Sequence, residues 1–310
     1  MKLVKIFFVT LFSFFLLLII GYQVGELTLK KLDEEARENF DGNFIKTELG
    51  TLCYKFHGPK DGEIILLIHG WSYPKNVFDN NIQALTRNGF RVLTFDHFGR
   101  GCSDRPRVTY DKNFYEKEVL GLINGLNIKS PFYILGYSMG GAVATTFTSR
   151  HPDKVKKLIL INPTGAGPSI QREQQLLLVP ILGPFLMSYF GKASVIKGIE
   201  EEFKKGHLTF KMSRSFKKQF DYRGTIHAFT SCLKNFVSKS QVSEYKKITN
   251  QKVPVQLIWA DNDEDVEFKG HEVVQRHIPG IVFNPINGFD HGVLYSHPHL
   301  VNKVILDFLN

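Results

Sequence analysis

The stretch Tyr133-Ile134-Leu135-Gly136-Tyr137-Ser138-Met139-Gly140-Gly141 decides how the rest of the chain is interpreted. Its apolar beginning predicts a buried strand, and the residues that follow it predict a helix. Glycines two residues before and after Ser138 leave room for a sharp strand-to-helix turn, which strains the serine backbone and points its hydroxyl out of the sheet. The first N–H groups of the helix would then point toward whatever the serine attacks. A Gly-x-Ser-x-Gly pattern arises by chance roughly 0.1 times in a chain of this length, so the interpretation needs a base, an acid and an oxyanion hole elsewhere.

Composition is that of an ordinary globular enzyme. The chain has 310 residues, of which 43% are hydrophobic and 22% charged, and this length suits one large α/β domain or a core with an inserted subdomain. Its three cysteines, Cys53, Cys102 and Cys232, are far apart and show no Cys-x-x-Cys spacing. We expect them to be free thiols, which neither require nor exclude a reducing compartment.

The N-terminus is distinct from the rest of the chain. Lys2 and Lys5 precede an uncharged run over residues 6–25, about as long as the hydrocarbon core of a bilayer requires. A cleaved signal peptide, which would leave a secreted protein, is the alternative. The first 35 residues contain no alanine, however, and only Gly21 or Gly25 offers a small residue for cleavage. We therefore expect a single-pass membrane anchor over 1–25. The basic flank favours a cytoplasmic N-terminus, but the mixed charges that follow leave the orientation open.

After a charged stalk over 26–42, expected to be helical, strand and helix patterns alternate. This alternation predicts a doubly wound, mostly parallel sheet with right-handed crossovers. It stops over residues 165–249, where only helical patterns occur, so this block is expected to be an inserted cap above the strand ends where such sheets bind ligands. The core is then 43–164 and 250–310. Strands are expected at 44–48, 52–56, 63–68, 90–95, 133–136, 155–161, 253–259 and 281–286, and core helices at 77–88, 114–126 and 300–309.

A serine nucleophile needs an adjacent base, and the base needs a group that fixes its tautomer. Among eleven histidines, His291 follows a strand and a glycine-bearing loop and precedes the final helix. A carboxylate could follow either of two strands, but residues 162–169 contain none. The loop 260–265 contains four, of which we favour Asp263 as the partner of the histidine, with Asp261 and Asp265 as alternatives.

Several motifs together carry a family resemblance. They are His69-Gly70-Trp71, Asp96-His97-Phe98-Gly99-Arg100-Gly101-Cys102-Ser103-Asp104, Gly136-Tyr137-Ser138-Met139-Gly140, Trp259-Ala260-Asp261-Asn262-Asp263, and His291 with Pro298 seven residues later. In this order, over about 43–310, they resemble the α/β-hydrolase superfamily, particularly its lipase, esterase and meta-cleavage-product hydrolase branch. The order Ser, Asp, His is also that of the family. The resemblance implies an α/β-hydrolase fold.

Residue by residue, the resemblance makes Ser138 the nucleophile, His291 the general base and then acid, and Asp263 the orienting carboxylate. The backbone N–H groups of Met139 and Trp71 match the oxyanion hole. His69 and residues 96–104 match structural support for that hole. Two positions depart from the family pattern: Ala260 replaces a usual glycine, and Ser296 replaces a frequent glutamate. No metal or organic cofactor is implied.

The activity implied is hydrolysis of carboxylic esters, with apolar or lipid-like acyl groups, through an acyl-enzyme on Ser138. One alternative is hydrolysis of a carbon–carbon bond in a vinylogous diketone, which the same branch performs with the same residues. A non-catalytic binding protein of this fold is another alternative. Haloalkane dehalogenases and epoxide hydrolases carry aspartate at the elbow, so a serine there argues against their chemistry.

The net charge of +9 is concentrated in the expected cap, whose 14 basic and 6 acidic residues give +8. This charge either covers a solvated helical surface or faces anionic lipid headgroups through Lys204, Lys205, Lys217 and Lys218. No nucleic-acid recognition module accompanies it. The apolar stretch 176–187 is too short and too interrupted by proline to span a membrane. It is expected to be cap core, a wall for an acyl chain, or an interfacial contact.

Overall fold

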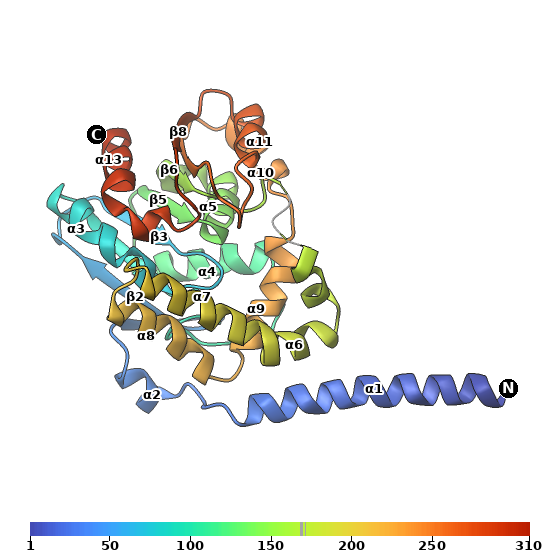
Figure 1. Ribbon diagram of the computed structural model, residues 1–310. Helices are drawn as coiled ribbons and strands as arrows, with labels where there is room; N and C mark the ends of the chain where they lie inside the picture. The colour runs from blue at the N-terminus through green and yellow to red at the C-terminus, as the bar shows by residue number, and fades with distance from the viewer. Residues whose placement is uncertain (168–169, 171) are drawn as a thin grey trace.

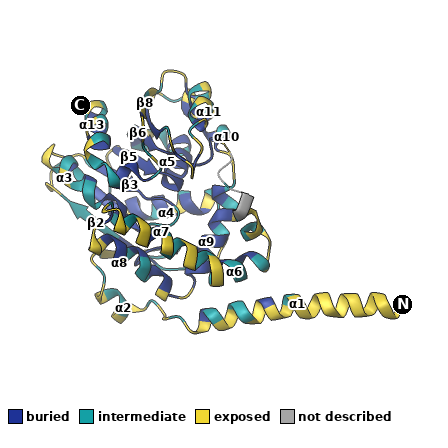
Figure 2. Ribbon diagram, in the orientation of Figure 1, coloured by how far each residue is buried: buried dark blue, intermediate teal, exposed yellow. Residues whose placement is uncertain are grey.

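The computed structural model of the chain describes residues 1–167, 170 and 172–310. Its body is an α/β fold, and a long helix, α1 (Lys2–Leu27), projects from one side of it (Figure 1). Almost all of α1 is exposed, whereas the strands are largely buried (Figure 2). The apolar side chains of α1 are therefore largely exposed, whereas those of the strands form the core of the body.

One eight-stranded sheet organises the body, in the order β1-β2-β4-β3-β5-β6-β7-β8. The β1–β2 and β2–β4 pairs are antiparallel and all other pairs are parallel. This arrangement confirms the predicted mostly parallel, doubly wound sheet. The strands are β1 Asn43–Thr47, β2 Gly50–His57, β3 Ile64–Ile68, β4 Arg91–Phe95, β5 Phe132–Tyr137, β6 Val155–Ile161, β7 Val255–Ala260 and β8 Val282–Ile286.

The apolar runs of the central strands are buried because helices cover both faces of the sheet. Alternate residues of β3 show this: Leu66 belongs to one core cluster, and Ile65 and Leu67 to the other. The first cluster includes residues of α4 (Lys112–Gly125), α5 (Met139–Arg150), α10 (Val242–Thr249) and α11 (Gly270–His277). The second includes residues of the 3-10 turn η1 (Lys75–Phe78), α3 (Asp79–Arg87), α12 (Val293–Ser296) and α13 (Pro298–Leu309). A short turn, η2 (Pro152–Lys154), leads into β6.

Between β6 and β7 the described chain forms helices and turns only. Four residues of this block, Met187, Phe220, Ile226 and Phe229, form a small core of their own. The helix α10 packs on α5 and α11, beside the sheet. The remaining elements, which we call the cap, are η3 (Arg172–Leu178), α6 (Leu182–Leu186), η4 (Met187–Gly191), α7 (Lys192–Lys204), α8 (Phe210–Lys218), η5 (Gln219–Asp221), α9 (Thr225–Cys232) and η6 (Leu233–Val237).

The segment expected to be a helical stalk has a different structure. Between α1 and β1 the helix is α2 (Glu34–Glu38). It begins where the Asp33 carboxylate accepts the N–H of Ala36. Lys30 instead forms a bridge with Tyr222 of the cap. Backbone pairing with the cap has taken the place of a continuous helix.

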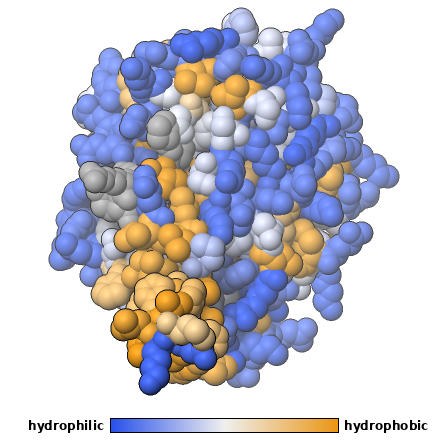
Figure 3. Space-filling view, turned by 90° about the vertical axis from the view of Figure 1, so that its right-hand side faces the viewer, coloured by the Kyte–Doolittle hydropathy of each residue, from blue (hydrophilic) through white to orange (hydrophobic). Residues whose placement is uncertain are grey.

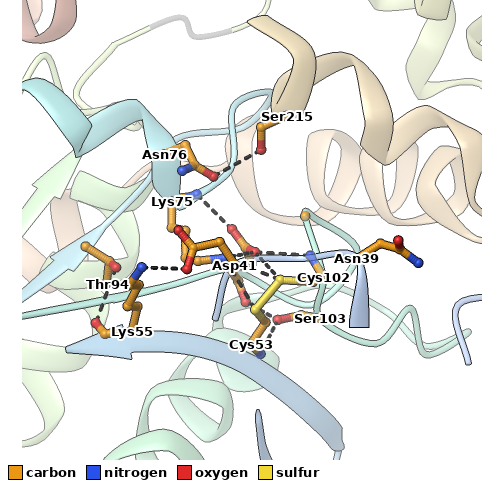
Figure 4. Close-up of a disulfide and its surroundings, with 12 residues drawn as sticks. Asn39, Asp41, Cys53, Lys55, Lys75, Asn76, Thr94, Cys102, Ser103 and Ser215 are labelled. Carbon is orange, nitrogen blue, oxygen red and sulfur yellow. Dashed lines mark hydrogen bonds and ion pairs between the residues drawn. A yellow bond between two sulfur atoms is a disulfide. The ribbon is translucent and has the colours of Figure 1, made fainter. Parts of the chain in front are cut away.

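Cys53 and Cys102 form a disulfide, which corrects the expectation that they are free thiols (Figure 4). Their Cα atoms lie 5.5 Å apart although 49 positions separate them, because β2 pairs antiparallel with β4 and the loop after β4 folds back. The buried Lys75 ammonium contacts both sulfurs at 3.3 Å and pairs with Asp96 at 2.8 Å. Cys232 is a free, buried thiol, as expected.

Candidate active site

Ser138 occupies the turn between β5 and α5 with φ 56° and ψ −122°, a conformation that side chains rarely adopt. Its amide donates to the carbonyl of Ile161 at 2.8 Å, which ties the turn to β6. A Cβ atom on Gly136 would lie 2.3 Å from the Gly140 carbonyl oxygen, and one on Gly140 would lie 2.0 Å from that of Ile68. Both glycines are therefore required by close backbone contact.

Two further loops bring a histidine and a carboxylate to this serine. His291 lies between β8 and α12, with Nε2 2.9 Å from Ser138 Oγ. Its Nδ1 lies 2.7 Å from Oδ2 of Asp263, which follows β7. The other carboxylate oxygen of Asp263 accepts the backbone N–H groups of Asp265 and Val266 at 3.0 and 2.8 Å. The three side chains singled out from the sequence thus form one continuous hydrogen-bonded chain.

The charges around His291 favour its protonated form. Burial lowers the pKa of the imidazole, but the charge and hydrogen bond of Asp263, aided by Asp265 and Asp290, outweigh burial and raise the pKa above its usual 6.5. An imidazole in this setting accepts a proton from Ser138 more readily than one buried alone.

The two alternative carboxylates have other positions. Asp261 accepts the backbone N–H of Gly288 at 2.6 Å and so fixes the loop that precedes the histidine. Asp265 is exposed and lines the cavity above the serine. Neither is a hydrogen-bond partner of the His291 ring.

The loop after β3 lies directly against the serine. A Cβ atom on Gly70 would be 3.1 Å from Cβ of Ser138. Arg100 Nε donates to the carbonyl of Trp71 at 2.5 Å, and the Trp71 indole donates to the carbonyl of Phe229 at 3.2 Å. No acceptor among the described residues takes the backbone N–H of Trp71 or Met139. Both amides are therefore available to a ligand at Ser138.

Residues 96–104, which we call the support loop, stabilise the loop that carries Gly70 and Trp71. The backbone N–H of His97 donates to Nε2 of His69 at 2.9 Å, and His69 Nδ1 lies 2.8 Å from the Gly70 carbonyl. Nδ1 of His97 in turn lies 2.5 Å from Oε2 of the buried Glu118. Burial lowers the pKa of His69 well below its usual range and lowers that of His97 to about 3, so both rings are neutral.

Two residues that the sequence reasoning missed hold the histidine loop. The Tyr137 hydroxyl and the Asn162 amide donate to the His291 carbonyl at 2.9 and 3.0 Å. Asn162 also accepts the N–H of Ala260 at 3.0 Å, and it has a positive φ of 45°, which asparagine tolerates better than most residues. The signal in the sequence is an asparagine directly after β6, at one of the two strand ends where a carboxylate would be expected. Ser296, where the family often has glutamate, contacts the neighbouring His297 ring.

A cavity of about 180 Å³ opens over Ser138. A second hollow of about 570 Å³ shares Tyr73, Asp265, His291 and Tyr295 with it and adds Glu201 and Glu202. Pockets for drug-sized ligands span roughly 300–1,000 Å³, so the first cavity accommodates a short acyl group without movement of the cap. It is lined by Gly70, Trp71, Ser72, Tyr73, Tyr137, Ser138, Thr164, Gln174, Leu233, Val237, Asp265, Val266, His291 and Tyr295.

Comparison with known proteins gives matches over most of the chain. Residues 63–298 match the family described as alpha/beta hydrolase fold. The chain is similar to a non-heme chloroperoxidase of Streptomyces lividans, with 26% identity over 86% of this chain and 98% of the relative. It is also similar to the monoacylglycerol lipase ABHD6 of Homo sapiens, with 26% identity over 86% of this chain and 81% of the relative.

Solved structures give the same fold. An esterase from Exiguobacterium antarcticum has a TM-score of 0.71 at 22% identity and covers 86% of this chain and 99% of its own. A meta-cleavage product hydrolase from Pseudomonas fluorescens has a TM-score of 0.70 at 18% identity, with coverage of 87% and 97%. At these identities the likeness concerns the fold, and the activity has to be argued from the site.

Proposed function

The chain belongs to the alpha/beta hydrolase family, and from this membership we propose that it is a serine hydrolase acting on carboxylic esters. The observation that carries the proposal is the hydrogen-bonded chain from Ser138 through His291 to Asp263, at the floor of a cavity. The monoacylglycerol lipase relative supports the same class of reaction.

In the proposed mechanism Ser138 Oγ attacks the ester carbonyl carbon while His291 Nε2 takes the serine proton. Asp263 holds the ring in the required tautomer and stabilises the imidazolium. The carbonyl oxygen becomes an oxyanion that the amides of Trp71 and Met139 bind, and one such donor is worth roughly 100- to 1,000-fold in turnover.

Collapse of the first tetrahedral intermediate breaks the bond from carbon to the alcohol oxygen. His291 gives its proton to that oxygen, and the alcohol leaves an acyl group on Ser138. Water then attacks the acyl carbon while His291 accepts one of its protons. The second collapse returns the proton to Ser138 and releases the carboxylic acid.

We further propose that the acyl group is apolar and that α1 anchors the protein in a membrane. Leu233, Val237 and Val266 give the cavity an apolar wall. The 26 residues of α1 have a mean hydropathy of 2.8 in their most apolar window, enough for a membrane span. The monoacylglycerol lipase among the relatives is consistent with a lipid-like ester.

Three of the four cap lysines that could face anionic lipid already have partners within the protein. Lys205 pairs with Glu202 at 2.8 Å and Lys217 with Glu200 at 3.3 Å. The Lys218 ammonium lies 4.0 Å from the centre of the Phe40 ring. Because these cations already have partners, contact of the basic cap with anionic lipid stays a prediction.

A substrate comparison tests the proposed reaction. The purified full chain in detergent is assayed with p-nitrophenyl esters of increasing acyl length and with a vinylogous dienoate, the substrate of carbon–carbon hydrolysis. We expect ester turnover that Ser138→Ala abolishes. Faster turnover of the dienoate would favour the carbon–carbon reaction, and no turnover of any substrate would favour a binding protein.

A further inference from the structure

One segment of the cap is apolar and contains no charged residue. Residues 174–191 include no Lys, Arg, Asp or Glu, yet Leu176 is 56% exposed and Phe190 66% exposed. Ten large apolar residues are exposed after α1 in the described chain. Five of the ten lie within residues 174–191. We call these five residues the apolar face: Leu176, Val179, Ile181, Tyr189 and Phe190.

The C-terminal part of α1 packs against the same surface. The Tyr189 hydroxyl donates to the carbonyl of Gly21 at 2.9 Å. A Cβ atom on Gly21 would lie 3.0 Å from the Phe185 ring, so the glycine permits close packing of the two helices. In Figure 3 the molecule is seen from the side toward which α1 projects. Hydrophobic surface extends there from this helix onto the body.

Polar contacts fix the direction in which α1 leaves the body. The buried Glu26 carboxylate accepts the N–H of Gly224 at 2.7 Å. The Arg223 guanidinium donates to the carbonyls of Leu27 and Leu29 at 2.9 and 2.7 Å. The helix is therefore held at several points where it enters the cap.

The length of α1 places this junction relative to a bilayer. Residues 2–20, which precede the contact at Gly21, span about 28 Å at about 1.5 Å per residue, close to the roughly 30 Å of a hydrocarbon core. With that segment in the membrane, Gly21 and the Tyr189 side chain lie at the boundary with water, where tyrosine is enriched in membrane proteins.

We propose that the apolar face docks on the bilayer that α1 spans, with Leu176 and Phe190 inserted among the lipids. This docking rests on the proposed anchoring by α1. Because residues 174–191 carry no charged side chain, inserting this segment desolvates no ion of its own. Continuity with α1 identifies lipid, rather than another protein, as the occupant of the face.

Docking would also set the route of the substrate. The turn η3 carries Leu176 on the apolar face, while Gln174 of the same turn lines the cavity over Ser138. Leu177 and Trp71 both pack against the small core of the cap. An ester that leaves the bilayer at this turn is therefore next to the proposed oxyanion hole.

Site-directed fluorescence tests the docking on the full chain in phosphatidylcholine nanodiscs. Single cysteines replace Leu176 or Phe190 and carry an environment-sensitive nitrobenzoxadiazole label; the disulfide and the buried Cys232 leave the new thiol as the reactive one. Val282→Cys, at a residue 45% exposed on β8, is the matched control. We expect blue-shifted emission, quenched by lipids brominated on their acyl chains, for labels at 176 and 190 but not at 282.

Three results would overturn the docking. Emission at 176 and 190 equal to that at 282 would mean that the face is in water. Blue-shifted emission without quenching by brominated lipid would mean that protein, such as a second copy, covers it. Intact mass of each sample establishes that α1 is retained, and loss of α1 would also overturn the proposal. Labelling of Ser138 by a fluorophosphonate in the same nanodiscs reports on the hydrolase proposal separately.

Discussion

The protein contains two histidine–carboxylate pairs with similar Nδ1–carboxylate contacts, one fully buried and one beside a cavity, in which the histidine pKa shifts in opposite directions. His291 Nδ1 lies 2.7 Å from Asp263, and His97 Nδ1 lies 2.5 Å from Glu118. For His291, burial is outweighed by acidic neighbours and the pKa is raised. For His97, burial dominates, Arg100 adds to it, and the pKa falls to about 3.

The difference lies in what surrounds each pair. His291 borders a cavity, and its second nitrogen faces Ser138. The His97 ring has no exposed surface, and its second nitrogen lies 3.2 Å from the carbonyl of His69. Burial also raises the pKa of Glu118 well above its usual range. A short histidine–carboxylate contact is therefore no sign of acid–base function unless the ring also reaches a reacting group.

Replacement of the first histidine should have the largest effect. His291→Ala removes the base, and we expect kcat to fall roughly 10⁶-fold, as for members of other serine triads. The free energy of unfolding should change little, because the side chain borders a cavity. Steady-state kinetics and urea unfolding measure the two effects. The double variant with Ser138→Ala should be no slower, and a further large loss would show that the two residues act independently.

Replacement of Asp263, the carboxylate of the same pair, should cause the second-largest loss of activity. Asp263→Asn keeps the shape but presents the ring with the wrong hydrogen-bond partner, and we expect kcat to fall about 10⁴-fold. Asp261→Asn is the matched control, since Asp261 contacts a backbone N–H and not the histidine. A greater loss in the control would transfer the orienting role to Asp261.

The second pair should contribute to stability instead. Glu118→Ala leaves the His97 ring and the Phe98 N–H without their partner, and we expect a loss of about 3 kcal/mol in the free energy of unfolding. Glu116→Ala, on the same helix but in a more exposed pair with Arg150, should cost less than about 1 kcal/mol. Urea titration compares the two, and equal costs would contradict the structural role of the buried pair.

The smallest expected effect concerns pH. The base must be neutral, so kcat/KM should decline as pH falls through the His291 pKa, which lies above 6.5. Asp265→Asn with Asp290→Asn removes two charges that raise this pKa, so the acidic limb should move to lower pH by less than about one unit. Asp307→Asn, on the exposed side of α13, should leave the limb in place. Movement to higher pH would contradict the assigned sign.

The sequence was most informative about residues that directly follow strands of the sheet. Ser138, Asp263 and His291 each follow a strand of one parallel sheet, and such strands end at the same edge. Their meeting therefore followed from the order of elements. The mostly parallel sheet followed in the same way from the alternation of patterns.

Features that depend on antiparallel pairing or on loop conformation could not be predicted in this way. The Cys53–Cys102 disulfide requires that β2 pair with β4, and no local spacing indicates this. The role of Asn162 depends on its positive φ after β6. The packing of α1 on the cap depends on Gly21 and Tyr189, which are 168 positions apart.

Labelling with a fluorophosphonate shows whether the Ser138 hydroxyl is a nucleophile that His291 activates. The probe reacts with an activated serine and forms a stable phosphonyl ester. Peptide mass spectrometry should locate one adduct on Ser138 in the unmodified protein, with none in Ser138→Ala and strongly slowed labelling in His291→Ala. An unlabelled wild-type protein, or an adduct on another serine, would mean that Ser138 is not the activated nucleophile.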